Sequence, residues 1–154
     1  MALEPTLLNT ATRQALIARV RALSPDAQRH WGKMDVTQMV WHVSEALRAA
    51  LGDIEAPNRS NWFFRRVIRP VAFYAPFPWP KNGPTLPEFD AVRVAPRVDA
   101  AHHAQLEALV TLVERCASTP MEGRPHVAFG PLTHAEWQHW GWRHTDHHLR
   151  QFGS

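Results

Sequence analysis

The chain has 154 residues, of which 45% are hydrophobic and 20% are charged. This length and composition are typical of a globular protein, and we expect residues 1–154 to form a single domain with a buried core. The net charge of +3 is small and the basic residues are dispersed, which argues against a nucleic-acid-binding surface. The densest basic group, Arg65, Arg66 and Arg69, follows Trp62, and we interpret it as one face of an aromatic helix.

Cys116 is the only cysteine, which excludes an intrachain disulfide and fits a reducing compartment. The first residues show no basic segment followed by an apolar run, so we expect no signal peptide. The longest uncharged aromatic stretch, from Pro70 to Pro80, contains four prolines and is too short to span a bilayer. We therefore expect a cytoplasmic protein that binds neither nucleic acid nor a membrane.

Apolar residues recur at helical spacing in five segments, and no segment shows a convincing strand pattern. Pro70 should kink or end the third helix. A proline-rich stretch over residues 75–98 and a loop over residues 120–131 connect the later helices. These features predict an all-α helical bundle. The expected helices span residues 10–23, 35–52, 61–74, 99–117 and 133–151.

Two of these helices begin with the signature of a capping box. Asp35 is followed three residues later by Gln38, and Thr133 by Glu136. Gly52 should end the first of the two helices. The capping residues therefore define the helices that carry the candidate site residues.

The last helix carries histidines on the face that its tryptophans mark as buried. At about 100° per residue, Trp140, His144, His148 and Gln151 all fall within about 60° of Trp137. The i, i+4 spacing of His144 and His148 lets both imidazoles reach one metal ion. The alternative is a chance pair, since the chain has ten histidines. Gln151 extends this face and is a candidate catalytic residue that would hydrogen-bond a ligand or substrate.

A third metal ligand must come from another helix, and His42 is the best candidate. Ala46 and Ala49 share its helix face, and their small side chains would let a neighbouring helix approach. A hydrogen-bonded histidine at the edge of the core is the alternative. Glu45, three residues from His42, is a second candidate for orienting an imidazole or acting as a base, although a solvated surface residue is the favoured interpretation. His147 lies at the edge of the last helix's inward face.

Other chemistries have little support. The sequence contains no glycine-rich phosphate loop, no GxSxG motif and no CxxC motif, and we expect Cys116 to pack at a helix end. The remaining histidines show no comparable arrangement, so we expect them on the surface or in loops. They are His30, His102, His103, His126, His134 and His139.

A histidine in the second helix followed by H-x-x-H-H-x-x-Q at residues 144–151 resembles the DinB/YfiT-like metalloenzyme superfamily. Three further stretches resemble a subgroup of unknown function within it: WGKMDVTQMVWHVSEAL from residue 31, PKNGPTLPEF from residue 80 and FGPLTHAEW from residue 129. The resemblance implies a four-helix bundle of up-down-down-up order, with the proline-rich stretch as its long crossover and one short extra helix. It also implies the metal ligands His42, His144 and His148.

The resemblance further implies zinc or nickel as the metal, and several relatives transfer groups to a low-molecular-weight thiol. Three imidazoles leave coordination positions open, which suits catalysis better than a structural role. We therefore expect a metal-dependent enzyme acting on a small electrophile, of the thiol S-transferase type. A metal-dependent hydrolase and a non-catalytic binding or stress-response module are the alternatives. Dimers are common among the relatives. Trp142 and Leu149 form a second apolar line that either a dimer contact or packing under a loop would explain, and we favour the homodimer.

Overall fold

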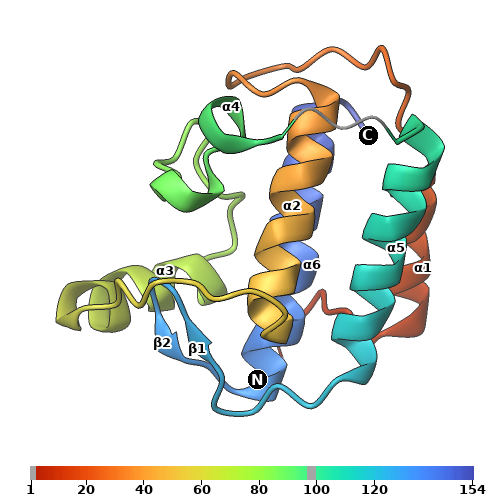
Figure 1. Cartoon of the computed structure of the whole chain (residues 1–154). Coiled ribbons are helices and arrows are strands. Elements are labelled where there is room, and N and C mark those ends of the chain that lie inside the picture. The colour runs from red at the N-terminus through yellow and green to blue at the C-terminus, as the bar shows by residue number, and fades with distance from the viewer. Residues whose placement is uncertain (1–2, 97–99) are drawn as a thin grey trace.

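The computed structural model describes residues 3–96 and 100–154. Four long helices lie side by side around a common core (Figure 1). Helix α2 packs against α5 and α6, and α1 packs against the same two helices. The expected all-α class is confirmed, since the described chain is mostly helical with a single two-stranded hairpin. The long helices are α1 (Thr10–Arg21), α2 (Val36–Leu51), α5 (His102–Ser118) and α6 (His134–Gln151).

The helix starts predicted from capping residues are confirmed. Asp35 and Gln38 form the capping box of α2, and Thr133 and Glu136 form that of α6. Gly52, at φ +80°, ends α2 in the left-handed conformation that glycine adopts without steric cost. The two helices that carry the candidate ligands therefore have well-defined ends.

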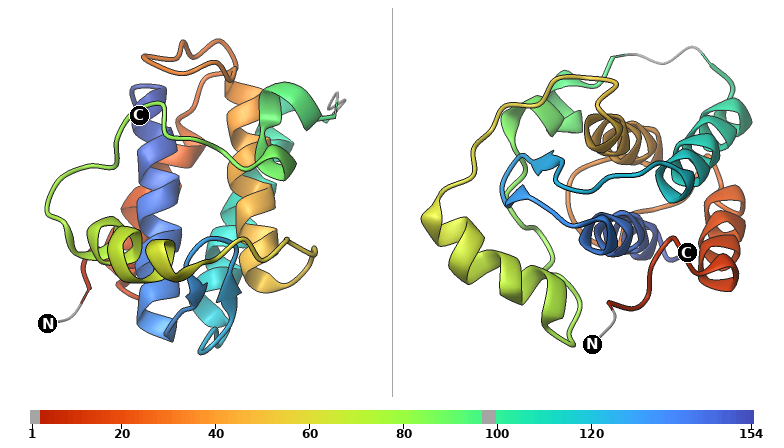
Figure 2. Two further views of the ribbon diagram at one scale, coloured as in Figure 1. Left: turned by 90° about the vertical axis from the view of Figure 1, so that its left-hand side faces the viewer. Right: turned by 90° about the horizontal axis from the view of Figure 1, so that it is seen from below.

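The aromatic segment after α2 is helical over residues 62–74, close to the predicted 61–74. It contains a π-helical turn, η1 (Phe64–Ile68), that continues directly into α3 (Arg69–Tyr74). Pro70 lies just after this distorted turn, and the helix continues past it to Tyr74, so the prediction that Pro70 could end the helix is wrong. Seen from below, this segment runs beside the four long helices rather than among them (Figure 2).

The long connections contain more structure than expected. The proline-rich stretch holds a 3₁₀ turn, η2 (Pro87–Phe89), and a short helix, α4 (Ala91–Val94). The predicted loop before α6 contains the antiparallel strands β1 (Pro125–His126) and β2 (Gly130–Pro131), with His126 opposite Gly130. Strands of two residues leave too little alternation for a sequence pattern to reveal. The predicted helix start at residue 99 lies outside the described residues.

The aliphatic core lies between the long helices. Val43 and Leu47 of α2 meet Leu109 and Val113 of α5, and all four are at most 1% exposed. Burial of a side chain of this size contributes about 1.5–3 kcal/mol. Toward α3 and the hairpin, the filling becomes aromatic and histidine-rich, and this part of the molecule contains the candidate site.

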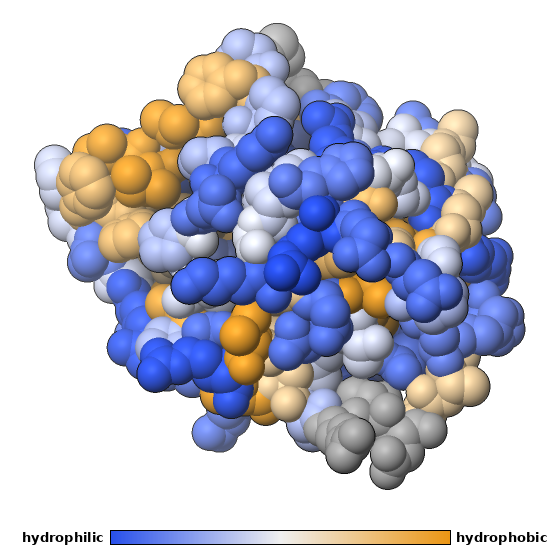
Figure 3. All heavy atoms as spheres, turned by 90° about the horizontal axis from the view of Figure 1, so that it is seen from above, coloured by the Kyte–Doolittle hydropathy of each residue, from blue (hydrophilic) through white to orange (hydrophobic). Residues whose placement is uncertain are grey.

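The surface seen from above is mostly polar, with apolar side chains gathered on the side where α3 lies (Figure 3). None of the helices in residues 3–96 and 100–154 is long and apolar enough to cross a membrane. For the second apolar line on α6, packing within the chain is the alternative that fits. Leu149 is 1% exposed and Trp142 packs against the core, so these residues give no support to the expected homodimer.

Candidate metal centre

Three enclosed histidines converge where the middle of α2 faces the C-terminal half of α6. Each of His42, His144 and His148 offers a ring nitrogen, and these atoms all lie within 4.8 Å of one another. The ring centroids are 5.2 Å apart for His42 and His144, and 4.7 Å apart for His42 and His148. This spacing lets a single ion bridge the three rings, as the i, i+4 pair on α6 predicts.

Hydrogen bonds orient two of the three rings. His42 donates from Nδ1 to the carbonyl of Phe89 at 2.7 Å, because a carbonyl oxygen can only accept. His148 Nδ1 lies 2.9 Å from Gln151 Oε1. Gln151 in turn donates from Nε2 to the carbonyl of Trp31 at 2.9 Å, which identifies Oε1 as an acceptor. Both histidines therefore keep the proton on Nδ1 and present the Nε2 lone pair.

His144 supplies the observation that tests whether a metal fits. Its Nδ1 is fully enclosed and has no hydrogen-bond partner within the part of the chain that the structure describes. The ring is held by Trp140, which stacks on it at 4.9 Å with an interplanar angle of 13°. A buried imidazole nitrogen without a partner is costly unless something binds the ring. The donor set and this unsatisfied ring together fit a divalent ion that accepts nitrogen ligands.

All three imidazoles are held in the neutral form that binds metals. Burial, together with a smaller effect of the neighbouring His42, lowers the pKa of His148 to about 3. Burial also lowers the pKa of His42 and, most strongly, that of His144. At neutral pH no proton therefore competes for the lone pairs.

All three triad histidines line one cavity, and His148 also lines a second. The larger, about 510 Å³, is lined mainly by apolar and aromatic side chains from α2, α3, α6, the hairpin and the proline-rich stretch. The smaller, about 250 Å³, lies against Trp31 and Gln151. His147 and His148 line both cavities. Ala46 and Ala49 line the larger cavity, so their small size makes room for a ligand and not, as expected, for a neighbouring helix.

Arg143 secures the proline-rich stretch at the edge of the larger cavity. Its guanidinium donates to the carbonyls of Ala75 and Phe77 and lies 5.6 Å from the ring of Trp79. Trp79 itself donates from Nε1 to the carbonyl of Ala72 at 2.9 Å. These contacts hold an otherwise irregular segment against α6 and complete the cavity wall.

One comparison with known proteins identifies the family. A family model described as "Protein of unknown function (DUF1569)" matches residues 3–154. The chain belongs to DUF1569. No curated protein and no solved structure matches it. The triad and its cavities are therefore features of a DUF1569 protein for which the family description gives no activity.

The other two predicted site residues of this DUF1569 protein, Gln151 and Glu45, do not line the larger cavity. Gln151 is 3% exposed and is occupied with His148 and Trp31, so it orients the ring of His148 and does not line the larger cavity. The Glu45 side chain is 19% exposed, lies 3.4 Å from Arg48 and lines neither cavity, so it reaches neither the triad cavities nor a fully solvated position. His147 contacts Trp31 and Trp79 at the boundary of the two cavities.

The expectation that all other histidines are surface or loop residues is wrong for His126 and His139. His139 is 3% exposed and bonds through Nδ1 to the carbonyl of Pro5 at 2.8 Å. His126 is 7% exposed, lies in the wall of the larger cavity, and has a pKa that burial lowers to about 3. Neither residue belongs to a periodic pattern that includes the triad. Their burial depends on segments distant in sequence, so periodicity could not reveal it.

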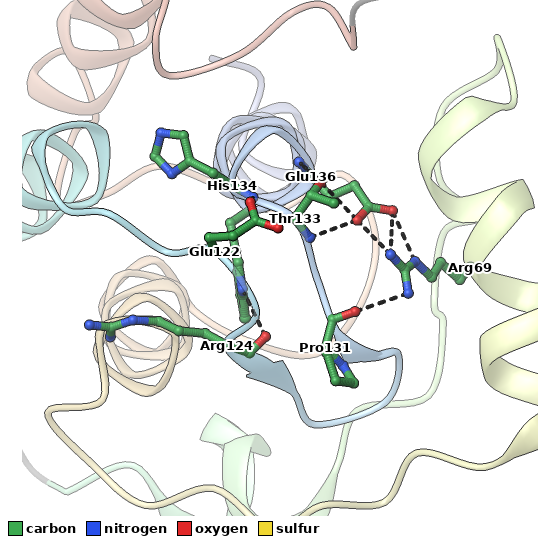
Figure 4. Close-up of polar contacts among 8 residues, drawn as sticks. Arg69, Glu122, Arg124, Pro131, Thr133, His134 and Glu136 are labelled. Carbon is green, nitrogen blue, oxygen red and sulfur yellow. Dashed lines mark hydrogen bonds and ion pairs between the residues drawn. The ribbon is translucent and has the colours of Figure 1, made fainter.

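The hairpin that carries His126 is anchored to the start of α6 (Figure 4). Arg69 donates to both carboxylate oxygens of Glu136 and, at 3.0 Å, to the carbonyl of Pro131 in β2. Trp137 donates from Nε1 to the carbonyl of Arg124, next to β1, at 3.1 Å. The same Glu136 closes the capping box of α6. Helix α3, the hairpin and α6 are thus joined at one point.

Proposed function

We propose that this chain is a metal-dependent enzyme of the DinB/YfiT type that transfers a small electrophile to a low-molecular-weight thiol. The proposal includes the four-helix bundle of up-down-down-up order that this type implies, with the four long helices as its members. One observation carries it: three converging neutral imidazoles, one with an unsatisfied buried nitrogen, border an apolar cavity of about 510 Å³. A cavity of this size is typical of small-molecule sites.

His42, His144 and His148 would hold the metal, with zinc or nickel as the ions that suit three imidazoles. Three protein ligands leave a position open, as in catalytic rather than structural sites. When bound, such an ion supplies Lewis acidity and lowers the pKa of a thiol or water. The chain contributes orientation: the carbonyl of Phe89 and the amide of Gln151 keep two rings in the ligating tautomer.

The arrangement of cavities favours transfer over hydrolysis. Because His147 and His148 line both cavities, two reactants can approach the triad from different sides. The mainly apolar lining of the larger cavity suits the body of an electrophile. The smaller cavity contains Lys33, Asn82 and Asp90 and suits a more polar molecule such as a thiol cosubstrate. A hydrolase needs only one organic reactant.

Metal analysis of freshly purified, unchelated protein tests the metal site. We expect about one divalent ion per chain, lost in His42→Ala and His148→Ala and retained in His103→Ala, which removes an exposed histidine outside both cavities. Binding of added zinc should weaken by at least about 100-fold in the first two variants. Absence of metal from purified protein, together with no binding on addition, would contradict the proposal.

A panel of small electrophiles, each incubated with and without cellular thiols, tests the reaction. We expect turnover that requires a thiol and that is absent from His148→Ala. Thiol-independent turnover would favour the hydrolase. Metal binding without turnover of any member would favour a binding module.

A further inference from the structure

The ring of His126 also lines the larger cavity, but the nitrogen that carries its proton is the opposite one from that of His42 and His148. The backbone N–H groups of Ala128 and Phe129 donate to its Nδ1, at 3.1 and 3.3 Å. An N–H donor requires a lone pair on its acceptor, so Nδ1 carries no proton. In a neutral imidazole the proton must then be on Nε2. The hairpin therefore fixes His126 in the Nε2–H tautomer.

The Nε2–H of His126 is free to donate into the cavity. It makes no hydrogen bond with residues 3–96 or 100–154, and it is not among the polar atoms that the protein seals off completely. His126 lines the cavity together with Phe129, Trp137 and Trp140, all of which are aromatic. A molecule that fills this cavity must offer an acceptor to the donor, because an apolar ligand without one would leave the N–H unsatisfied.

Aromatic contacts hold the ring of His126 at a defined place relative to the triad. It stacks on Phe129 at 4.6 Å and 17°, and meets Trp140 edge-on at 5.1 Å and 73°. Trp140 in turn stacks on His144. The rings of His126 and His144 therefore both contact the indole of Trp140, a separation that a small molecule can span.

We propose that His126 is a substrate-binding residue whose Nε2–H selects small apolar molecules that carry a carbonyl oxygen. The carbonyl would accept the hydrogen bond while the apolar body lies along Trp140 and the reacting group faces the triad. This inference rests on the proposed function only in taking the larger cavity as the substrate site. It assigns to the substrate an acceptor group distant from the reacting atoms.

Two variants separate the binding role of His126 from its structural role. In His126→Asn the side-chain oxygen replaces Nδ1 as acceptor for the Ala128 and Phe129 amides, but the donor at the Nε2 position is lost. In His126→Gln an amide N–H is restored near that position, while the acceptor for the backbone is lost. The asparagine variant should therefore fold with near-native stability and the glutamine variant should be less stable.

Two probes of similar shape measure the donor directly. Acetophenone carries a carbonyl where ethylbenzene carries a methylene group, and NMR titration of the full-length protein gives both dissociation constants. We expect the wild type to prefer acetophenone by roughly fivefold. The preference should disappear in His126→Asn, return at least in part in His126→Gln, and persist in His148→Ala.

The outcomes distinguish this inference from the metal proposal. If the protein binds no metal but still prefers acetophenone over ethylbenzene, the result contradicts the metal site and leaves the role of His126 intact. Equal affinity of the wild type for the two probes, or an unchanged preference in His126→Asn, would overturn the role of His126. Loss of the preference in His148→Ala would also overturn it, because the carbonyl would then be recognised at the triad.

Discussion

The triad and His126 use the same side chain in opposite ways. At the triad, acceptors engage Nδ1 of His42 and His148, so the rings present lone pairs. In the hairpin, backbone donors engage Nδ1 of His126, so the ring presents a proton. The partner of one ring nitrogen thus decides whether the other can bind a metal or donate to a ligand. Burial makes this division stable, because it lowers the pKa of all these rings and excludes the doubly protonated form.

The largest expected effect concerns the acceptor that orients His148. Gln151→Leu removes the partner of His148 Nδ1 and also leaves the carbonyl of Trp31 without its donor. We expect zinc affinity, measured by competition with a chelating dye, to fall by about 10–100-fold. Gln151→Glu retains an acceptor for Nδ1 and is the matched control. Equal affinities of the two variants would show that the orientation of His148 does not depend on residue 151.

A smaller effect on the same contact should follow from Gly32→Ala. Gly32 has φ +79°, and a Cβ there would lie 2.5 Å from Gln151 Nε2. The substitution forces Gln151 to move and adds about 1 kcal/mol of backbone strain in the left-handed conformation. We expect lower stability together with several-fold weaker zinc binding. Gly123→Ala, at φ +74° with open space around its Cβ, is the control that should carry the strain without the loss of metal. Unchanged zinc binding in Gly32→Ala would contradict the role assigned to this contact.

In the hairpin that carries His126, Arg69→Ala should lower stability without changing metal binding at the triad. The ion pair with Glu136 is largely buried, with Glu136 6% exposed, and its loss leaves a buried carboxylate unpaired. We expect a fall of about 1–3 kcal/mol in the free energy of unfolding, measured by urea denaturation, and zinc affinity close to wild type. A loss of zinc affinity equal to that of Gln151→Leu would show that the two regions are not independent.

The ion pair between Arg69 and Glu136 also predicts how the stability of the protein depends on pH. Burial alone would raise the pKa of Glu136, but hydrogen bonds from Arg69 and Thr133 outweigh it and hold the pKa below the usual 4.5. A lowered folded-state pKa gives stability that is present above the unfolded value and is lost as the pH falls through the folded value. The difference between wild type and Glu136→Gln should therefore be complete at pH 6 and shrink in denaturation experiments below pH 4.5. A difference that grew on acidification would have the wrong sign.

The smallest expected effect concerns Cys116, which belongs neither to the triad nor to the hairpin that carries His126. It is 3% exposed, and burial raises the pKa of its thiol to about 12. The thiolate is the reactive form, so we expect iodoacetamide at pH 8 to leave Cys116 unmodified in the native protein and to modify it after denaturation. Cys116→Ala should retain thiol-dependent turnover. Rapid native labelling would indicate that this part of the core opens.

Local sequence signals predict most of the triad but not the position of His126 in the hairpin. The capping boxes of α2 and α6 and the i, i+4 spacing of His144 and His148 depend on residues at most four positions apart. His42 required the family resemblance, because no local pattern relates it to α6. His126 becomes a wall residue only because β1 pairs with β2 and packs against α6, and strands of two residues leave no periodicity. Ala46 and Ala49 were assigned to helix contact because a small residue suits both a close helix and a cavity.

The most direct test of the different roles of the triad and His126 starts from protein freed of metal with a chelator. This protein is titrated with zinc, and the titration is followed by histidine ¹⁵N NMR. We expect the ring-nitrogen resonances of His42, His144 and His148 to change together at one equivalent. We also expect His126 to keep its proton on Nε2 throughout. No change at the triad, or a change at His126 that follows the zinc titration, would contradict the separate roles of the two regions.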